Sequence, residues 1–427
     1  DISAEHVQAA VAALPRTARI RVGDFFQIDW DRELAAVPEP ILVVGNPPWV
    51  TSAALGALGA RNLPRKHNLK QLRGLDAVTG KSNFDVSEWM LLRLLTALQG
   101  RNATIAVLCK TSVARRVIEF AASQALAISP IGLWRIDTQA QFGAAVDAVL
   151  LACRTARSAG ARGVWPVFAA LDDATPRSRL GVIDGALASD VRGFRDTQHL
   201  SGRCQPEWRS GLKHDCAAVM ELSARDGGLV NGRGDAVAVE DAVVYPLLKS
   251  SDLANRRLEP RRRVIVPQTA LGQDTAALRV TAPQAWRYLT RHRHLLDARK
   301  SSIYRGQPPF AVFGVGEYSF APWKVAISGL YKRLEFCLVG PSAGRPTLLD
   351  DTCYFLPFDR ATDARTALRA LQSEPAQAYL QARIFWDAKR PISKTLLQGL
   401  DLAKLASSAA KPAGEPRQQR RRQALAI

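Results

Sequence analysis

The chain has 427 residues, 47% of them hydrophobic, so it can form two or three domains with packed cores. It contains no apolar run of the roughly 18 residues that a membrane span requires, and no signal-peptide pattern opens it. Its six cysteines form no CxxC or CxxH pair, which excludes zinc sites and disulfide frameworks of recognisable spacing. We therefore expect a cytoplasmic protein with reduced thiols, no metal site and no membrane partner.

The formal net charge is +19, and it is unevenly distributed along the chain. Residues 1–150 carry 16 Lys and Arg against 13 Asp and Glu, a net charge of +3, and the remainder carries 42 against 26, a net charge of +16. Such an excess favours a polyanionic partner, most often nucleic acid. A generally arginine-rich proteome is the alternative origin of the charge. The distribution favours a first part that carries chemistry, followed by a part that grips nucleic acid.

Residues 1–150 alternate helix-like and strand-like segments, which is typical of an α/β unit with parallel strands. In chain order we expect a helix at 5–14, strands at 18–22 and 41–44, a helix at 87–98, a strand at 104–108, a helix at 113–125, and a strand pair at 131–136 and 148–152. We therefore assign a first domain to residues 1–155.

The rest of the chain is less regular. Residues 156–203 are polar and rich in Ala, Gly and Asp, so we expect a connection with small elements. Residues 204–405 mix short strand-like runs with helix-like segments and predict a mixed α+β domain. The strand-like runs are 264–266 and 310–313, and the helices are expected near 283–296 and 362–371. Residues 406–427 are rich in Gln and Arg and predict a basic, disordered tail.

The strand at 41–44 ends in Gly45 and is followed by Asn46-Pro47-Pro48-Trp49. Each proline holds φ near −65° and lacks an N–H, and a residue before proline avoids the helical region. The chain therefore leaves the strand in a stiff, extended turn that aims the Asn46 side chain and nearby carbonyls at one point. An amino group held there would donate its hydrogens to these acceptors and direct its lone pair outward, and Trp49 could stack on a planar group. An ordinary strand-to-loop turn is the alternative.

This tetrapeptide and its flanking motifs resemble the adenine-N6 DNA methyltransferases of bacterial restriction–modification systems, the Asn-Pro-Pro-aromatic class with a C-terminal target recognition domain. The resemblance implies a Rossmann-like, S-adenosylmethionine-dependent methyltransferase fold followed by a mixed α+β DNA-recognition domain. It also implies methyl transfer from S-adenosylmethionine to the N6 amino group of adenine in double-stranded DNA. Asn46, Pro47, Pro48 and Trp49 would be the catalytic residues.

The cofactor residues follow from the order of Asp1-Ile2-Ser3, then Gly23-Asp24-Phe25-Phe26, before the tetrapeptide. By the resemblance, Asp1 accepts from the ribose hydroxyls, Asp24 accepts from the cofactor adenine, and Phe25 packs on the adenine ring. A helix N-cap is the alternative for Asp24, and an unattached terminus is the alternative for Asp1.

Two more segments match the family around the active site. Lys81-Ser82-Asn83-Phe84-Asp85-Val86-Ser87-Glu88-Trp89 resembles the opening of the helix after the catalytic loop, and residues 131–151 resemble a late strand pair. In the family, an aromatic at the place of Phe142 stacks on the flipped adenine, because an enzyme must take its base out of the duplex. A core position is the alternative for Phe142.

Weaker matches in the second half lie at 208–215, 245–253, 318–325 and 389–394. Basic residues among aromatics and loops suit phosphate positioning and base readout. The resemblance thus implies DNA contacts from Arg209, Lys213, Lys249, Lys324, Lys389, Arg390 and Lys394. For each of these, a solvated surface charge is the alternative.

The sequence departs from the family in lacking the first strand and the glycine-rich turn that cradle the cofactor. Phe313-Gly314-Val315-Gly316 is not expected to replace them, because residues 317–320 continue strand-like. We therefore expect an N-terminally truncated chain: a fragment, a subunit completed by a partner, or a degenerate gene product. A protein-glutamine or RNA amino-methyltransferase and a catalytically dead DNA-binding remnant remain as alternative functions.

Overall fold

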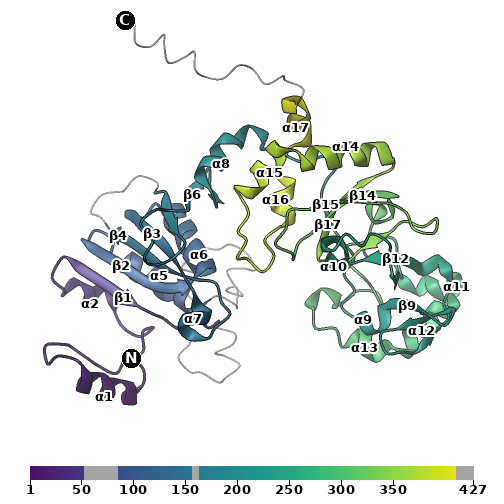
Figure 1. Ribbon diagram of the computed structural model, residues 1–427. Helices are drawn as coiled ribbons and strands as arrows, with labels where there is room; N and C mark the ends of the chain where they lie inside the picture. Colours follow the sequence, from purple (N-terminus) through teal and green to yellow (C-terminus); the bar gives the residue numbers. More distant parts are fainter. Residues whose placement is uncertain (52–84, 156–162, 410–427) are drawn as a thin grey trace, which may run out of the picture. The chain divides into compact units, whose positions relative to one another are not determined.

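The computed structural model describes residues 1–51, 85–155 and 163–409, and the chain divides into two compact units (Figure 1). The first unit is Asp1–Phe194, and the second begins at Arg195. Expectations for residues 81–84 and for the basic tail beyond residue 409 lie outside the described residues. Among the described residues, no helix is long and apolar enough to cross a membrane.

The first unit is built on a seven-stranded sheet of order β1-β2-β4-β3-β5-β6-β7. Its strands are β1 (Ile41–Gly45), β2 (Ala103–Lys110), β3 (Ile128–Ile136), β4 (Ala148–Thr155), β5 (Trp165–Phe168), β6 (Ser178–Ile183) and β7 (Ala186–Ala188). β1 runs parallel to β2, and β4 runs antiparallel to both β2 and β3. The carboxyl ends of β1, β2 and β3 therefore meet at one edge of a mixed sheet.

Helices follow from local sequence signals. The first unit contains α1 (Ala4–Ala13), α2 (Trp30–Ala35), α5 (Val86–Ala97), α6 (Thr111–Ser123) and α7 (Thr138–Phe142), and α8 (Val191–Asp196) spans its end. The side chains of Ser3 and Asp29 cap α1 and α2 by accepting backbone N–H groups. α5 and α6 pack together, and Leu95 and Val113 are fully buried there. Each such side chain contributes about 1.5–3 kcal/mol on burial.

Three expected strands are corrected. Residues 18–22 form no strand, because no ladder partner pairs with them, and the Arg21 side chain instead meets Glu33 at 2.9 Å. Residues 310–313 are not a strand either, because Phe310 has a left-handed φ of 65° and Phe313 makes only an isolated bridge. Residues Glu317–Phe320 form a 3₁₀ helix, η5, rather than continuing as a strand.

Residues 156–203 contribute more than a connection. Their described part contains β5, β6 and β7, and β5 pairs with β3 and thereby extends the first sheet. The unit boundary then falls between Phe194 and Arg195, inside α8.

The second unit has two sheets. The six-stranded sheet has the order β11-β10-β9-β13-β12-β16 and the four-stranded sheet the order β15-β14-β17-β8. The first contains β9 (Glu221–Arg225), β10 (Gly228–Asn231), β11 (Ala236–Val237), β12 (Val244–Leu248), β13 (Arg262–Ile265) and β16 (Leu348–Leu349). The second contains β8 (Arg209–Ser210), β14 (Trp323–Ser328), β15 (Phe336–Val339) and β17 (Cys353–Phe358). Leu248, Leu349 and Phe355 belong to one buried cluster that joins the two sheets.

Helices cover both sheets of the second unit. They are α9 (Ala217–Met220), α10 (Ser250–Ala254), α11 (Leu278–Thr281), α12 (Pro283–Arg291), α13 (Arg293–Asp297), α14 (Ala361–Gln372), α15 (Glu374–Gln381), α16 (Lys394–Gln398) and α17 (Leu402–Ala409). The expected helix near 283–296 is two helices, and the first begins at Pro283 as predicted. α14 lies on the four-stranded sheet, against β14 and β15 (Figure 1).

Candidate active site and basic surface

The loop Asn46–Trp49 leaves the carboxyl end of β1, at the edge where β2 and β3 also end. In open α/β sheets, ligands bind at this edge. The side chain of Asn46 is exposed there, and Trp49 is half-buried. The end of β2 places Lys110 at the same edge, and the end of β3 leads into α7. Polar and aromatic groups from three strands thus converge on the tetrapeptide.

Trp49 and Phe142 are in contact, although 93 positions separate them in the sequence. Their ring centroids are 5.8 Å apart with an interplanar angle of 84°, an edge-to-face pair. Phe142 is the last residue of α7 and remains 50% exposed. Asp137 caps this one-turn helix through the N–H of Ala140, and Gly143 ends it with a φ of 63°. Both residues predicted to stack on the target base therefore lie together beside Asn46.

The chain that follows Trp49 is tied to the start of α5. The N–H of Val86 donates to the carbonyl of Val50 at 3.0 Å, and Thr51 forms a β-bridge with Asp85. Because Asp85 occupies the N-cap position of α5, the end of the loop after β1 is fixed against a buried helix.

A buried ionic cluster supports this junction. Asp85, 7% exposed, lies 2.9 Å from the ammonium of Lys110 and 3.5 Å from the guanidinium of Arg116. Glu88, only 2% exposed, lies 2.5 Å from Arg116. Charges at this depth are stable only when paired. The ion pairs indicate that these side chains support the loop after β1. They are Asp85, Glu88, Lys110 and Arg116.

No role was predicted for these four residues from the sequence. Asp85 and Glu88 are three positions apart, which puts them on one face of a helix. That spacing was the only sign in the sequence that the two carboxylates act together. Their cationic partners lie in β2 and α6, and only the tertiary structure brings these partners to the carboxylates.

The predicted cofactor residues lie in one segment of the first unit. The N–H of Gly23 donates to the carbonyl of Asp1 at 2.8 Å, which brings Asp1 next to Asp24. Each carboxylate also makes local bonds: Asp1 accepts from the N–H of Ser3, and Asp24 accepts from the N–H of Phe26 at 3.0 Å. Acceptors and an aromatic therefore lie together here, and their cofactor role stays a prediction.

Phe25, the predicted cover of the cofactor adenine, is engaged in the fold. Its ring centroid lies 4.6 Å from that of Trp30, whose indole N–H donates to the Phe25 carbonyl at 3.0 Å. Trp30 thus fixes both the ring and the backbone of Phe25.

In the second unit, two carboxylates gather four of the predicted DNA-binding residues. Glu207 lies 3.0 Å from Arg209 and 3.1 Å from Lys394. The hydrogen bond from Lys394 is the main cause that lowers the pKa of Glu207. Asp351 lies 3.7 Å from Lys213 and 3.8 Å from Arg390. Residues that are far apart in sequence are therefore brought together in two clusters, and the bridging carboxylates were not foreseen. Lys389, next to Arg390, is exposed.

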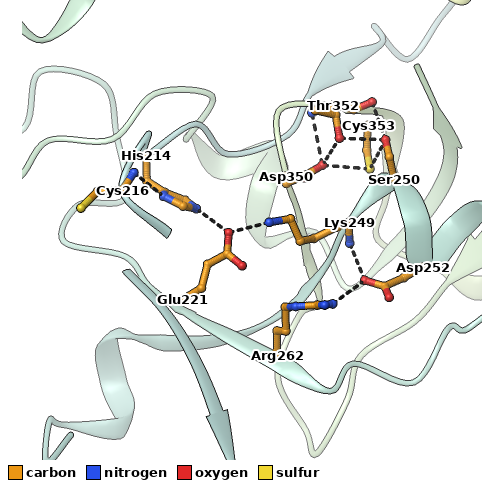
Figure 2. A network of polar contacts seen from close by, with 10 residues as sticks. All are labelled: His214, Cys216, Glu221, Lys249, Ser250, Asp252, Arg262, Asp350, Thr352 and Cys353. Atoms are coloured by element: carbon orange, nitrogen blue, oxygen red, sulfur yellow. Dashed lines mark hydrogen bonds and ion pairs between the residues drawn. The ribbon is translucent and has the colours of Figure 1, made fainter. Parts of the chain in front are cut away.

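Lys249 belongs to the polar network of Figure 2. Its ammonium lies 2.7 Å from Glu221, which also accepts from Nε2 of His214 at 3.3 Å. Nδ1 of His214 accepts from the N–H of Cys216, so Nε2 carries the ring proton. Burial raises the pKa of Glu221, but the hydrogen bonds from His214 and Lys249 outweigh it and the pKa falls to about 2. The ammonium of Lys249 is therefore paired with Glu221 within the fold.

The same view shows how the loop that carries Asp351 is held. The carboxylate of Asp350 accepts from the hydroxyl of Thr352 at 2.6 Å and from the thiol of Cys353 at 3.3 Å (Figure 2). The hydroxyl of Ser250 donates to the carbonyl of Thr352 at 2.9 Å. Asp351 thus sits between two anchored neighbours.

Lys324 does not lie where a DNA contact requires. Its side chain is 1% exposed, and its ammonium donates to the carbonyl of Ala321 at 2.6 Å. Burial lowers the pKa of Lys324 to about 7. β14 is an inner strand with both faces covered, so Lys324 points into the core and not at the surface, which corrects this part of the expectation.

Comparisons with known proteins identify the relatives of the chain. No protein-family model matches the sequence. Over 389 residues the chain is 42% identical to the type II methyltransferase M.NspV of Nostoc sp. (strain ATCC 29411 / PCC 7524), covering 91% of this chain and 81% of the relative.

A solved structure shares the fold. It is the type IIL restriction-modification enzyme MmeI in complex with DNA, with a TM-score of 0.52 and 12% sequence identity. The match covers 92% of this chain and 51% of the other, so this chain spans about half of that chain's length. At this identity the likeness shows the fold alone. The 42% identity to M.NspV over most of both proteins shows more: the chain belongs to the family of type II methyltransferases.

Proposed function

We propose that the chain is a DNA methyltransferase of a restriction–modification system that transfers a methyl group from S-adenosylmethionine to the N6 amino group of adenine. Family membership supports methyl transfer. The observation that carries the adenine assignment is the contact of Trp49 with Phe142 beside Asn46, because it offers aromatic surface next to acceptors for an amino group. The shared fold with MmeI, a restriction-modification enzyme whose structure was solved in complex with DNA, supports the same substrate class.

The donor set of the first unit fits the proposed cofactor. Asp1 and Asp24 are carboxylate acceptors beside Phe25, suited to ribose hydroxyls, an adenine amino group and an adenine face. We assign these residues to cofactor binding in a Rossmann-like methyltransferase domain. The cofactor, when bound, supplies an electrophilic methyl group.

Asn46 and its prolines would orient the target. The amide oxygen of Asn46 and a neighbouring carbonyl accept the two amino hydrogens, and the lone pair of the nitrogen then points at the methyl donor. Orientation of this kind removes much of the barrier without a covalent intermediate. The nitrogen would form its bond to the methyl carbon as the bond between that carbon and the sulfonium sulfur breaks. The neutral thioether would be the leaving group, and one amino proton would pass to solvent. Trp49 and Phe142 would stabilise the flipped adenine by stacking.

The second unit would recognise the target site. Arg209 lies in β8 and Lys213 in the segment that follows it. Arg390 lies in the loop before α16 and Lys394 at the start of α16, and Lys389 adds an exposed ammonium. Contacts of this type fix the register of a protein on duplex DNA.

The test is transfer of labelled methyl from S-adenosylmethionine to mixed bacterial DNA, followed by nucleoside analysis. We expect labelled N6-methyladenine with the full chain, at least a hundredfold loss in Asn46→Ala, and no loss in Asn255→Ala, a matched change in the second unit. Label in protein or RNA in place of DNA would exclude the DNA substrate. DNA binding without any transfer would identify a non-catalytic DNA-binding protein.

A further inference from the structure

A cavity of about 280 Å³ lies in the second unit, at the ends of β12 and β13, and no role has been given to it so far. Arg262 and Arg263 of β13 line it, together with Arg345 and the carboxylate-bearing Asp241. Pockets for drug-sized ligands occupy about 300–1,000 Å³. This cavity therefore suits a small group rather than a large organic ligand.

Arg262 is neutralised within the fold. Its guanidinium lies 3.3 Å from the carboxylate of Asp252, which also accepts from the backbone N–H of Lys249 at 2.9 Å (Figure 2). Arg262 therefore shapes the cavity wall but brings little net charge to it.

Arg345 is held in place without a negative partner. Its guanidinium donates to the carbonyls of Asp241 and Ala242, and it lies 4.3 Å from the centroid of the Tyr245 ring. Carbonyl dipoles and a ring face orient a cation but do not cancel its charge. Reciprocal backbone bonds between Ser342 and Arg345 close the turn that carries it. This cation is therefore preorganised.

Arg263 supplies a second charge without a counter-ion. Its side chain is exposed on β13, opposite Pro246, and within the described ranges no carboxylate forms an ion pair with either Arg263 or Arg345. The guanidiniums of Arg262, Arg263 and Arg345 carry three positive charges at the cavity. The carboxylates of Asp252 and Asp241 carry two negative charges, so a net charge of one positive remains. An anion with one negative charge and several acceptor oxygens is the complementary ligand.

We propose that this cavity binds one phosphodiester group of the DNA backbone, an inference that rests on the proposed DNA substrate. Each phosphate of duplex DNA carries a single negative charge, which matches the excess, whereas a free phosphate carries nearly two at neutral pH. The planar fork of arginine also suits two phosphate oxygens at once. The cavity thus adds an anchor outside the Glu207 and Asp351 clusters.

The experiment measures affinity of the full chain for duplex DNA as a function of salt. We expect Arg263→Ala with Arg345→Ala to weaken binding about tenfold and to lower the slope of log K against log salt by about one. The matched control removes the same charge with Arg225→Ala and Arg365→Ala, two exposed arginines of the same unit. The control should leave the slope unchanged.

Folding and charge are separated by two further variants. Arg263→Ala alone touches only an exposed side chain, and we expect it to give a partial loss with an unchanged unfolding midpoint. Arg345→Lys keeps the positive charge but loses the planar guanidinium, and we expect a DNA affinity between those of the wild type and the double variant. Equal affinity and slope in the double variant and the wild type would overturn the inference and leave the proposed function intact.

A wild-type chain that does not bind DNA would instead refute the proposed function. Titration with inorganic phosphate at about pH 5, where the ion carries about one negative charge, followed by ³¹P NMR with chloride as the reference salt, then decides the cavity by itself. Binding that is lost in the double variant would retain a phosphate site and reassign its source to a free ion. No binding would overturn the site.

Discussion

At the scale of single residues, Lys324 combines a buried position with the lack of a carboxylate partner among the described residues. Its pKa falls from an ordinary 10.5 to about 7 in the folded chain, and desolvation by burial is the cause. Between pH 7 and 10.5 the unfolded chain then binds more protons than the folded chain. The free energy of unfolding should therefore rise with pH across this window, and the full penalty should be present below pH 7.

We predict that Lys324→Met stabilises the protein below pH 7, with an upper limit of about 5 kcal/mol set by the pKa change. The variant should also lose the rise of stability between pH 7 and 10. Urea unfolding at pH 6.5 and 9 measures both effects, with the exposed Lys389→Met as the control. A variant that keeps the wild-type pH dependence would show that Lys324 is not the titrating group.

Glu221 also contributes stability that rises with pH, but in a more acidic window. Its pKa is lowered from 4.5 to about 2 by hydrogen bonds from His214 and Lys249 that outweigh the effect of burial. Its contribution to stability is present above pH 4.5 and is lost as the pH falls toward 2. We predict that Glu221→Gln lowers the free energy of unfolding by about 1–3 kcal/mol at pH 7. Acid unfolding of the variant should show a shallower slope between pH 4.5 and 2, and a slope equal to that of the wild type would contradict the network.

Residue roles could be predicted from sequence where the constraint is local. Two prolines set the geometry of Asn46–Trp49 within four positions, so the turn was foreseeable. The contact of Trp49 with Phe142 was implied by their shared expected role. The burial of Lys324 was not foreseeable, because it depends on α10 and α14, which pack against β14 in the folded chain.

At the scale of elements, the junction between α5 and the loop after β1 depends on Asp85. This carboxylate pairs with Lys110 and Arg116, while its backbone is bridged to Thr51. Removing it leaves Lys110 without its carboxylate and Arg116 with Glu88 alone, and breaking a buried ion pair in this way costs roughly 3–5 kcal/mol. We predict that Asp85→Asn lowers kcat for methyl transfer about 10- to 100-fold and leaves the KM for DNA within about twofold.

The split between kcat and KM separates positioning from global damage. Asp85→Glu keeps the charge and should recover part of kcat, and Glu33→Gln, an exposed carboxylate paired with Arg21, should change neither constant. If Asp85→Asn raised KM and left kcat unchanged, the cluster would support DNA binding in place of the loop.

Elements with strong local periodicity could be predicted to within a few residues, whereas isolated strands could not. Helices at Val86–Ala97 and Thr111–Ser123 and the antiparallel pair of β3 with β4 appear where expected. The prediction of a strand at 18–22 was wrong, because a strand is stable only with a neighbouring strand that completes its ladder of hydrogen bonds. The sequence pattern contains β-branched residues there but no information about a partner.

At the scale of the whole molecule, the charge distribution matters more than any single cation. Residues after 150 carry a net charge of +16, and the described cationic clusters of the second unit are bridged by Glu207 and Asp351. A third carboxylate, Asp215, lies 2.6 Å from the ammonium of Lys213. The three carboxylates offset three of the five cations at these clusters, which leaves a net of about two positive charges. The five cations are Arg209, Lys213, Lys389, Arg390 and Lys394. Each phosphate contact contributes about −0.9 to the slope of log K against log salt.

We therefore predict that raising salt from about 50 to 200 mM weakens DNA affinity about 12-fold, from a slope near −1.8. Glu207→Gln releases Arg209 and Lys394 from their shared carboxylate, so it should tighten binding and make the slope more negative by up to one. Glu335→Gln, which pairs with the exposed Arg256 elsewhere in the second unit, is the matched control. Because both variants add the same net charge, a steeper slope in Glu207→Gln alone would locate the contact at this cluster. Equal effects in both would mean that overall charge, and not these clusters, determines affinity.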